Sequence, residues 1–293
     1  MDFKIISDLF LELTYACSGG CAICSNPSRE GFLTFEQVEQ IPLVLNGLST
    51  PKLFNIVLSG GDPLFYYSSG HKLADVIAVL QPFTHQFVIE TAKALETQEG
   101  RAMLEKIVSY SIPEVLVATS YHNYPTNLNF GAILDYLLTQ QVFDHFRLTL
   151  TTMDQESTTQ ELQDLVESLS HKFTFIGPRY LAKIGAKTVF LDFQPLHKCG
   201  SSTEGVDPGE VCDLFPEREI RINPAGNMFL CHGYSSQKVP VLRTVGQPIT
   251  RKDVTDYIAR FPEGRRTCAQ CVTAIASTPT TISKVFYTDE YIP

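Results

Sequence analysis

Three cysteines stand close together near the start of the chain, in the order Cys17-Ser-Gly-Gly-Cys21-Ala-Ile-Cys24. The spacing CxxxCxxC on one loop allows three thiolates to hold three corners of an iron-sulfur cube. The fourth iron is then left without a protein ligand, and an open metal position separates a catalytic site from a closed structural one. These residues predict metal-based chemistry at this loop, and the alternatives are a fragment of a zinc site or a chance cluster.

The triplet follows the strand-like segment Asp8–Thr14 and resembles the defining motif of the radical S-adenosylmethionine (SAM) enzymes. The resemblance implies that SAM chelates the open iron of a 4Fe-4S cluster through its amino and carboxylate groups. It also implies that an electron from the reduced cluster cleaves the sulfonium, and that the resulting 5′-deoxyadenosyl radical takes a hydrogen atom from the substrate. One position departs from the family: the residue before the third cysteine is often aromatic there, whereas Ile23 here weakens a contact to the adenine.

A second motif, Ser59-Gly60-Gly61-Asp62-Pro63, directly follows the apolar run Asn55–Leu58. Two glycines let the backbone approach a ligand closely at the C-terminal end of a strand, where barrel enzymes assemble their sites. The segment looks like the GGEP segment of radical SAM enzymes, which implies that its last four residues bind SAM at the methionine amino group. The shorter aspartate stands in place of the commoner glutamate. Alone, such a segment is more often a plain turn.

Polar residues near the ends of the middle strands are candidates for contacts to the SAM ribose and carboxylate. Ser120 begins a Ser-Tyr-His segment that looks like the Ser-x-His or Ser-x-Asp of the family, and Glu90 closes the third predicted strand. A serine hydroxyl can donate to or accept from a ribose, and a solvated loop or helix cap is the alternative for both residues. His122 and Tyr124 are candidates for substrate contact or proton transfer. Arg147, inside a strand, could pair with a carboxylate in the barrel or point to solvent.

Four later cysteines form a second group, which comprises Cys212, Cys231 and the pair Cys268-Ala-Gln-Cys271. The segment 222–231 reads as a β-hairpin that can present the first two thiols to a metal, and the CxxC completes a four-thiolate site. The arrangement resembles the twitch domains of radical SAM enzymes, the shorter relatives of SPASM domains. This resemblance implies an auxiliary 4Fe-4S cluster. A structural zinc ribbon uses the same ligands, and spacing alone does not separate the two metals.

Cys199 follows the last predicted barrel strand and is left over. It could be an inert buried thiol, replace one of the four ligands of the second site, or act in the active site as a hydrogen-atom donor. Weak S–H bonds suit the donor role, which a radical epimerase needs in order to quench the substrate radical from the opposite face. Cys199 is therefore the candidate catalytic residue.

Short apolar runs alternate with helical patterns, which predicts βα units around a parallel sheet. The strand candidates are Leu9–Thr14, Leu53–Leu58, Gln86–Glu90, Val115–Thr119, Phe146–Thr151 and Thr188–Phe193. The helix candidates are Thr34–Leu45, His71–Leu80, Thr97–Tyr110, Phe130–Gln140 and Ser157–Leu169. Capping boxes are predicted at Thr34 with Gln37 and at Ser157 with Gln160.

Six strands and five helices fit the partial (β/α)6 TIM-like barrel that the resemblance implies, although an open doubly wound α/β fold has the same elements. After Phe193, Gly, Pro, Ser and Cys become frequent and only short strand-like segments remain. We therefore expect a radical SAM barrel over residues 1–200. A small C-terminal iron-sulfur domain, built from a β-hairpin and a helix, is expected over residues 201–293.

Composition is typical of a soluble intracellular enzyme. Of 293 residues, 44% are hydrophobic, which can fill a sizeable core. The 32 acidic against 23 basic residues give a net charge of −9, which disfavours a nucleic-acid partner. The N-terminus does not resemble a signal peptide and no stretch approaches the length of a membrane span. Eight cysteines in such a chain indicate reduced, metal-bound thiols in the cytoplasm.

The resemblance implies a radical SAM oxidoreductase or isomerase, and we expect dehydrogenation or epimerisation of a small polar intermediate of the sugar or aminocyclitol type. An enzyme that modifies ribosomal peptides is the alternative, although the residues before the first strand leave no room for the N-terminal peptide-binding domain of many such enzymes. The expected partners are the substrate and a reductant of the flavodoxin or ferredoxin type. An alternative of another class is a non-catalytic zinc or iron-sulfur protein that carries electrons or binds a partner.

Overall fold

The computed structural model describes residues 6–24, 31–47, 52–109, 114–152, 154–176, 180–195, 219–229 and 241–259. Five of the predicted metal or catalytic residues lie outside these ranges, namely Cys199, Cys212, Cys231, Cys268 and Cys271. The predicted domain boundary near Gly200 also lies outside them. The second metal site and the division into two domains therefore stay predictions.

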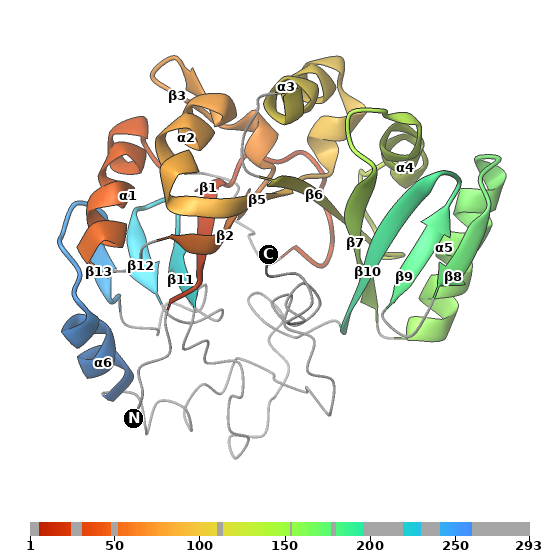
Figure 1. Ribbon diagram of the computed structural model, residues 1–293. Coiled ribbons are helices and arrows are strands. Elements are labelled where there is room, and N and C mark those ends of the chain that lie inside the picture. Colours follow the sequence, from red (N-terminus) through yellow and green to blue (C-terminus); the bar gives the residue numbers. More distant parts are fainter. Residues whose placement is uncertain are drawn as a thin grey trace.

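A curved sheet of eleven strands forms the centre of the described part, in the order β13-β12-β11-β1-β2-β5-β6-β7-β10-β9-β8 (Figure 1). Every pairing from β11 to β10 is parallel, whereas the outer pairings on both sides are antiparallel. The order has two ends, β13 and β8, so within the described residues the barrel is partial. The predicted α/β fold of the TIM-barrel kind is confirmed.

The parallel strands are β1 (Asp8–Thr14), β2 (Leu53–Gly60), β5 (Thr84–Glu90), β6 (Glu114–Tyr121), β7 (His145–Thr152), β10 (Lys187–Pro195) and β11 (Glu219–Ile222). The antiparallel edge strands are β8 (Phe173–Ile176), β9 (Leu181–Ile184), β12 (Asn227–Phe229) and β13 (Arg243–Thr244). A separate small hairpin consists of β3 (Tyr67–Ser68) and β4 (His71–Lys72).

The helices are α1 (Phe35–Gly47), α2 (Leu73–Leu80), α3 (Gln98–Ser109), α4 (Phe130–Thr139), α5 (Gln155–Ser168) and α6 (Arg251–Ala259). Short 3-10 turns are η1 (Pro63–Phe65), η2 (Gln81–Phe83) and η3 (Lys93–Glu96). Helices α1 to α4 lie along the outer, convex side of the curved sheet (Figure 1). This arrangement follows from right-handed crossovers between parallel strands, which place the connecting helices on one face.

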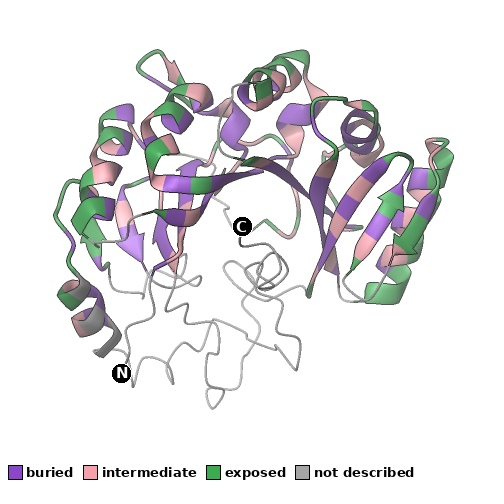
Figure 2. Cartoon of the chain, viewed as in Figure 1, coloured by how far each residue is buried: buried purple, intermediate pink, exposed green. Residues whose placement is uncertain are grey.

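The main hydrophobic core lies between these helices and the outer face of the sheet, where the strands are largely buried (Figure 2). Strand residues alternate between two faces, so one face of each strand joins this core and the other points to the inside of the barrel. A small apolar cluster on the inner face contains Val57, Val88, Leu116 and Ala118, with Phe10 packed against it. The inner-face residues further toward the C-terminal ends of the same strands are polar.

All six predicted barrel strands and all five predicted helices are present, and their ends differ from the prediction by no more than two residues. Helix α2 starts two residues later than predicted, because His71 and Lys72 pair with β3 as strand β4 and the helix begins only at Leu73. Strands β8 and β9 are present in the structure but are not predicted from the sequence. They form an antiparallel hairpin between α5 and the sixth barrel strand.

One of the two predicted capping boxes is confirmed. At the start of α1 the backbone N–H of Thr34 donates to Gln37 Oε1 (2.9 Å), and the N–H of Gln37 donates to Thr34 Oγ1 (3.3 Å). The second box is wrong, because α5 begins earlier, at Gln155, and Ser157 is its third residue. Asp154 caps this helix instead by accepting from the Glu156 N–H at 3.1 Å.

The predicted C-terminal hairpin is present as β11 and β12, with a turn at Gly226, whose φ of +76° suits glycine. Its first strand pairs in parallel with β1, from Asp8 opposite Glu219 to Leu11 opposite Ile222. The hairpin therefore extends the barrel sheet directly beside the strand that leads to the cysteine triplet.

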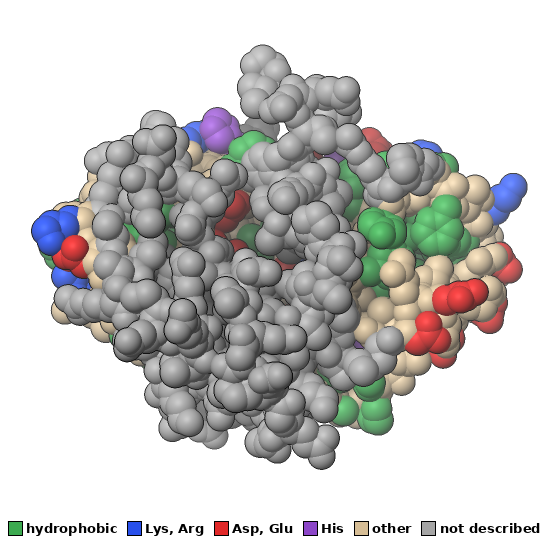
Figure 3. All heavy atoms as spheres, turned by 90° about the horizontal axis from the view of Figure 1, so that it is seen from below, with side chains coloured by type: hydrophobic (Ala, Val, Ile, Leu, Met, Phe, Trp, Pro, Cys, Tyr) green, Lys and Arg blue, Asp and Glu red, His purple; other side chains and the backbone are tan. Residues whose placement is uncertain are grey.

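Among the described residues, no helix combines the length and the apolar character needed to cross a bilayer. Large hydrophobic side chains reach the surface near the β8–β9 edge, where Phe175 is 47% exposed and Tyr180 36%. Hydrophobic side chains also gather beside acidic ones on the side of the molecule that carries β8 to β10 (Figure 3). Tyr180 packs on Phe193 with a centroid distance of 5.0 Å, so part of this surface stabilises the strand edge.

The two predicted capping residues, Thr34 and Ser157, allow a direct test of where α1 and α5 begin. Thr34→Ala removes a real cap and should lower the free energy of unfolding by about 1 kcal/mol. Ser157→Ala lies inside α5 and should change it by no more than about 0.5 kcal/mol. Urea unfolding of both variants, with Asp154→Ala as the positive control, checks this. An equal loss for the two substitutions would contradict the assigned start of α5.

Candidate active site

The three described cysteines lie on the loop that follows β1, at the C-terminal edge of the parallel sheet. Cys17 and Cys21 are half-buried, whereas Cys24 is exposed. Gly19 lies between two of the sulfurs: a β-carbon there would be 3.3 Å from Cys17 Sγ and 3.6 Å from Cys21 Sγ. Its N–H donates to Cys17 Sγ at 3.3 Å. A β-carbon there would also lie 3.2 Å from Leu128 Cδ2, so Gly19 occupies a position where two sulfurs and a neighbouring side chain come close together.

The donor set fits an iron-sulfur cube. Three thiols lie on one loop, and a cube takes three thiolates around a larger body rather than three ligands on one centre. Burial raises the pKa of the Cys17 thiol, and Asp62, Cys21 and Cys24 raise it further against the opposing Gly19 N–H. Iron would supply the positive charge that these crowded thiolates require.

The glycine motif packs directly against the start of the cysteine loop. The N–H of Gly61 donates to Thr14 O (2.5 Å), and the N–H of Asp62 donates to Ala16 O (2.9 Å). Neither glycine has room for a side chain: a β-carbon at Gly60 would clash with Thr14 O, and one at Gly61 would lie 2.5 Å from Ala16 O. Gly60 also has φ of +119°. The two motifs recognised in the sequence therefore form one structural unit.

Asp62 ties this unit to the end of β5. Its carboxylate is 1% exposed and accepts from the N–H groups of Leu64 (3.2 Å), Ala92 (3.0 Å) and Ala94 (2.8 Å) and from the Thr91 hydroxyl (2.8 Å). Burial raises the pKa of Asp62, and the four donors oppose that shift. These bonds engage the Asp62 carboxylate with protein donors. Asp62 therefore contributes to a ligand site by fixing the position of the Gly60–Gly61 backbone.

The loop between β6 and α4 holds the cysteine loop from the other side. Gly19 O accepts from the Thr126 hydroxyl (3.0 Å) and from the Asn127 N–H (2.6 Å). Thr126 Oγ1 also lies 3.1 Å from Cys21 Sγ and accepts from the Leu128 N–H at 3.1 Å. The N–H of Ala22 donates to a carbonyl of the same loop. One hydroxyl therefore joins the loop after β6 to a cysteine sulfur.

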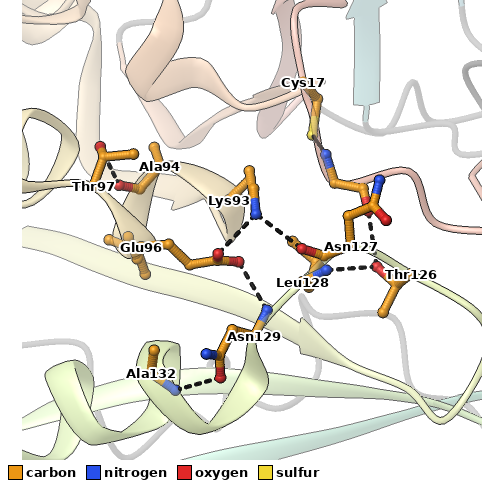
Figure 4. Close-up of polar contacts among 12 residues, drawn as sticks. Cys17, Lys93, Ala94, Glu96, Thr97, Thr126, Asn127, Leu128, Asn129 and Ala132 are labelled. Carbon is orange, nitrogen blue, oxygen red and sulfur yellow. Dashed lines mark hydrogen bonds and ion pairs between the residues drawn. The ribbon is translucent and has the colours of Figure 1, made fainter.

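A partly buried ion pair anchors that second loop on η3 (Figure 4). Lys93 Nζ contacts Glu96 Oε2 at 2.7 Å and donates to Asn127 O at 2.8 Å. Glu96 Oε1 accepts from the N–H of Asn129, the residue that caps α4 through the Ala132 N–H. The ends of β5 and β6 are thereby held in a fixed relation to the cysteine loop.

A charged group lies on the inner face of the barrel below these loops. Glu90 accepts from the Ser59 hydroxyl at 2.7 Å and from Arg147 Nη2 at 3.0 Å. Arg147 is 2% exposed, which decides between the two alternatives for this residue: it pairs with a carboxylate inside the barrel. Burial raises the pKa of Asp192, while the charge of Arg147 lowers it. Three strands, β5, β7 and β10, therefore contribute charges to one region.

A second charged pair faces the same region from β1 and β11. Burial raises the pKa of Glu12 to about 7, against the opposing charge of Arg221 and a hydrogen bond from Tyr15, and Glu90 adds to the increase. Tyr15 Oη lies 3.3 Å from Glu12 Oε2. The Arg221 guanidinium lies over the Phe10 ring, 3.9 Å from its centroid, and Nε donates to Glu219 at 2.7 Å.

Two further predicted residues, Ser120 and His122, differ in their exposure. Ser120 is exposed and lies on β6 opposite Thr149, on the strand face that also carries Ala118. His122 is buried against Phe130 with a ring-centroid distance of 5.1 Å, and burial lowers its pKa. Ser120 is thus open to a ligand from the inner face, whereas His122 packs beneath α4.

Several residues that shape the site carry no sequence motif. The contacts of Thr126, Lys93 and Glu96 depend on loops that meet only in the folded chain. Glu12 and Asp192 alternate with apolar neighbours along their strands, and this alternation is the one signal that could have placed them on an inner barrel face.

No protein-family model matches the sequence, and no curated protein matches it. The fold, however, is shared with several solved structures. The crystal structure of BtrN in complex with AdoMet and 2-DOIA superposes with a TM-score of 0.56 at 14% identity, over 96% of this chain and 98% of BtrN. Histidine-tagged anSMEcpe with bound AdoMet, the same molecule as SAM, gives 0.57 at 12% identity, over 88% and 83% of the two chains.

Streptococcus suis SuiB gives a TM-score of 0.52 at 11% identity over 82% of this chain, and the match spans 63% of the SuiB chain. All three are radical SAM enzymes. At these identities the likeness concerns the fold. The resemblance that the cysteine triplet indicates is therefore confirmed at the level of the fold.

The packing of Gly61 can be tested by adding one methyl group. Gly61→Ala places a β-carbon against Ala16 O, and we expect a loss of about 1–3 kcal/mol in unfolding free energy. Displacement of the cysteine loop should also reduce the iron retained after reconstitution. The matched control is Gly131→Ala in α4, where the nearest atom is 3.4 Å away and a gain of roughly 0.5–1 kcal/mol is expected. Iron retention equal to wild type in Gly61→Ala would refute the tight docking of the two loops.

Thr126→Val tests the link between the loop after β6 and Cys21 with little change in volume. The substitution removes the hydroxyl that joins Gly19, Leu128 and Cys21, so unfolding free energy should fall by about 1–2 kcal/mol and iron should be lost faster to a chelator. Thr126→Ser keeps the hydroxyl and should behave as wild type. Chelator kinetics followed by absorbance would count against this contact if Val and Ser variants lose iron equally fast.

Proposed function

We propose that this chain is a radical SAM enzyme. The observation that carries the proposal is the docking of the Gly60–Gly61 backbone onto the loop of Cys17, Cys21 and Cys24 at the C-terminal edge of a partial parallel barrel. The three cysteines would hold a 4Fe-4S cluster, and the adjoining glycine loop would receive SAM. When bound, these groups supply a 5′-deoxyadenosyl radical that removes one hydrogen atom from the substrate.

The protein residues would bind, orient and shield the reactants. Gly60 to Pro63 present backbone groups, which Asp62 fixes in place through its four hydrogen bonds. Ser120, at the end of β6, is proposed to contact the SAM ribose or carboxylate, and Glu90, at the end of β5, is proposed to accept from the ribose hydroxyls. The inner face of the barrel would hold the substrate below the cofactor, because this is where the polar residues collect.

We propose dehydrogenation or epimerisation of a small polar molecule as the overall reaction. Support comes from the match to BtrN over nearly the full length of both chains, since BtrN is described in complex with 2-DOIA. Cys212, Cys231, Cys268 and Cys271 would bind an auxiliary 4Fe-4S cluster, whose chemistry is the transfer of the second electron in an oxidation. Cys199 would serve as hydrogen-atom donor if the product is an epimer. A flavodoxin or ferredoxin would supply electrons.

Peptide modification is a second candidate. Native anSMEcpe with bound AdoMet and the Cp18Cys peptide superposes with a TM-score of 0.55 at 12% identity, over 88% of this chain. The inner-face charges favour the small polar molecule, because a peptide backbone presents mainly neutral amide groups to a site.

Anaerobic reconstitution tests the function. Wild-type protein should contain about eight iron atoms per chain and release 5′-deoxyadenosine from SAM after reduction. Cys17→Ala should lose about four of these iron atoms and all SAM cleavage, whereas Cys199→Ala should keep both. Zinc in place of iron in the wild-type protein, or SAM cleavage that survives in Cys17→Ala, would exclude the radical mechanism.

A further inference from the structure

Arg147 carries hydrogen-bonding groups that its protein neighbours leave unused. Nη2 donates to Glu90, but Nε and Nη1 are buried and have no hydrogen-bond partner among the described residues. Buried donors without an acceptor are costly, and native proteins pair more than nine in ten of them. A guanidinium is also always charged, so it cannot escape this cost by losing a proton. An oxygen acceptor that is not part of the protein would satisfy these donors.

The position of Arg147 on its strand directs it to the inner face of the barrel. Phe146 and Leu148, its neighbours in sequence, belong to the outer hydrophobic core, so the side chain between them points the other way. In register, Arg147 lies opposite Ala118 on β6, and Ala118 lies opposite Glu90 on β5. The small Ala118 side chain leaves the path across β6 open, which is how the guanidinium reaches Glu90 two strands away.

The surroundings of Arg147 contain more negative than positive charge. Glu90 pairs with Arg147, and Asp192 faces the same inner surface, because its neighbour Leu191 belongs to the outer core. The second cation, Arg221, is engaged by Glu219 and the Phe10 ring. The two carboxylates outnumber the single guanidinium left for a ligand, so the region favours a neutral or cationic molecule. It offers donors from Arg147 to a ligand oxygen and the carboxylate of Asp192 to a ligand ammonium.

The region also adjoins both loops of the candidate cofactor site. Ser59, which donates to Glu90, directly precedes Gly60, and Thr91, which follows Glu90, donates to Asp62. From the other side, Tyr15 of the cysteine loop bonds Glu12. A molecule bound against Arg147 would therefore lie next to the loops proposed to hold SAM.

We propose that Arg147 and Asp192 form the substrate anchor, with Glu90 holding the Arg147 guanidinium in place, and that the anchor selects a small hydroxylated molecule carrying an amino group. Arg147 donates to a hydroxyl or carbonyl oxygen of this molecule, and the carboxylate of Asp192 accepts from its ammonium group. The inference deepens the proposed function, since it names the substrate class and the residues that hold the substrate in the same barrel.

Three six-carbon sugars that differ in charge provide a test by binding alone. Glucosamine, glucose and glucuronate are titrated into reconstituted, unreduced full-length protein with SAM present, and affinity is followed by ligand-observed NMR. Glucosamine should bind at least tenfold more tightly than glucuronate, with glucose between them. Arg147→Gln should weaken both glucosamine and glucose by roughly tenfold, because two charge-assisted donors are lost. Asp192→Asn should weaken glucosamine and leave glucose unchanged.

Two controls separate binding from folding. Arg243→Gln removes the same charge from an exposed pair with Asp253 and should leave all three affinities within about twofold. Arg147→Lys keeps a charge beside Glu90 but offers a single nitrogen, so it should fold and still show weakened sugar binding. Thermal unfolding of each variant accompanies the titrations.

The outcomes distinguish this inference from the function on which it rests. Tetra-alanine is titrated in the same way as a peptide probe. If the wild-type protein cleaves SAM, three results would overturn the anchor alone: no sugar binding, tightest binding of glucuronate, or tighter binding of tetra-alanine than of glucosamine. Weakened SAM binding with unchanged sugar binding in Arg147→Gln would assign the guanidinium to SAM and also overturn it. Sugar binding in the expected order without any SAM cleavage would instead refute the proposed reaction and leave the anchor standing.

Discussion

The structure of the site depends on one close approach between two stretches of backbone. Gly60 and Gly61 lie so near the residues Thr14 to Ala16 that no β-carbon fits between them, and two N–H groups of this loop donate to carbonyls of the cysteine loop. Backbone hydrogen bonds of this kind fix position without depending on flexible side chains. The orientation of Cys17 relative to the glycine loop is therefore set by the ends of β1 and β2.

The other loops extend this constraint around the C-terminal edge of the sheet. Asp62 joins the glycine loop to the end of β5 by accepting four hydrogen bonds, and Thr126 joins the cysteine loop to the loop after β6. Lys93 and Glu96 hold that loop through a partly buried pair. Parallel strands bring all these ends to one edge, so residues more than a hundred positions apart can hold one cluster of thiols.

The inner face of the barrel differs from the outer face in the polarity of its side chains. The outer face is apolar and packs against helices, which stabilises the fold through burial. The inner face changes along the strands from the small cluster around Val57 and Val88 to charged residues such as Glu90 and Arg147. Charges held in a buried place cost free energy, and clusters of such charges in a cleft are often found at functional sites.

The sequence by itself determined the local features, because they depend on neighbours in the chain: the strand and helix periods, the capping box at Thr34, the hairpin turn at Gly226 and the CxxxCxxC spacing. It misplaced the start of α5 and missed β8 and β9, because segments of only four residues carry little periodic signal. Only the tertiary structure decided that β11 pairs with β1, that Thr126 meets Cys21 and that Arg147 reaches Glu90 across Ala118. These contacts join residues far apart in sequence, and strand register, which no single segment encodes, sets them.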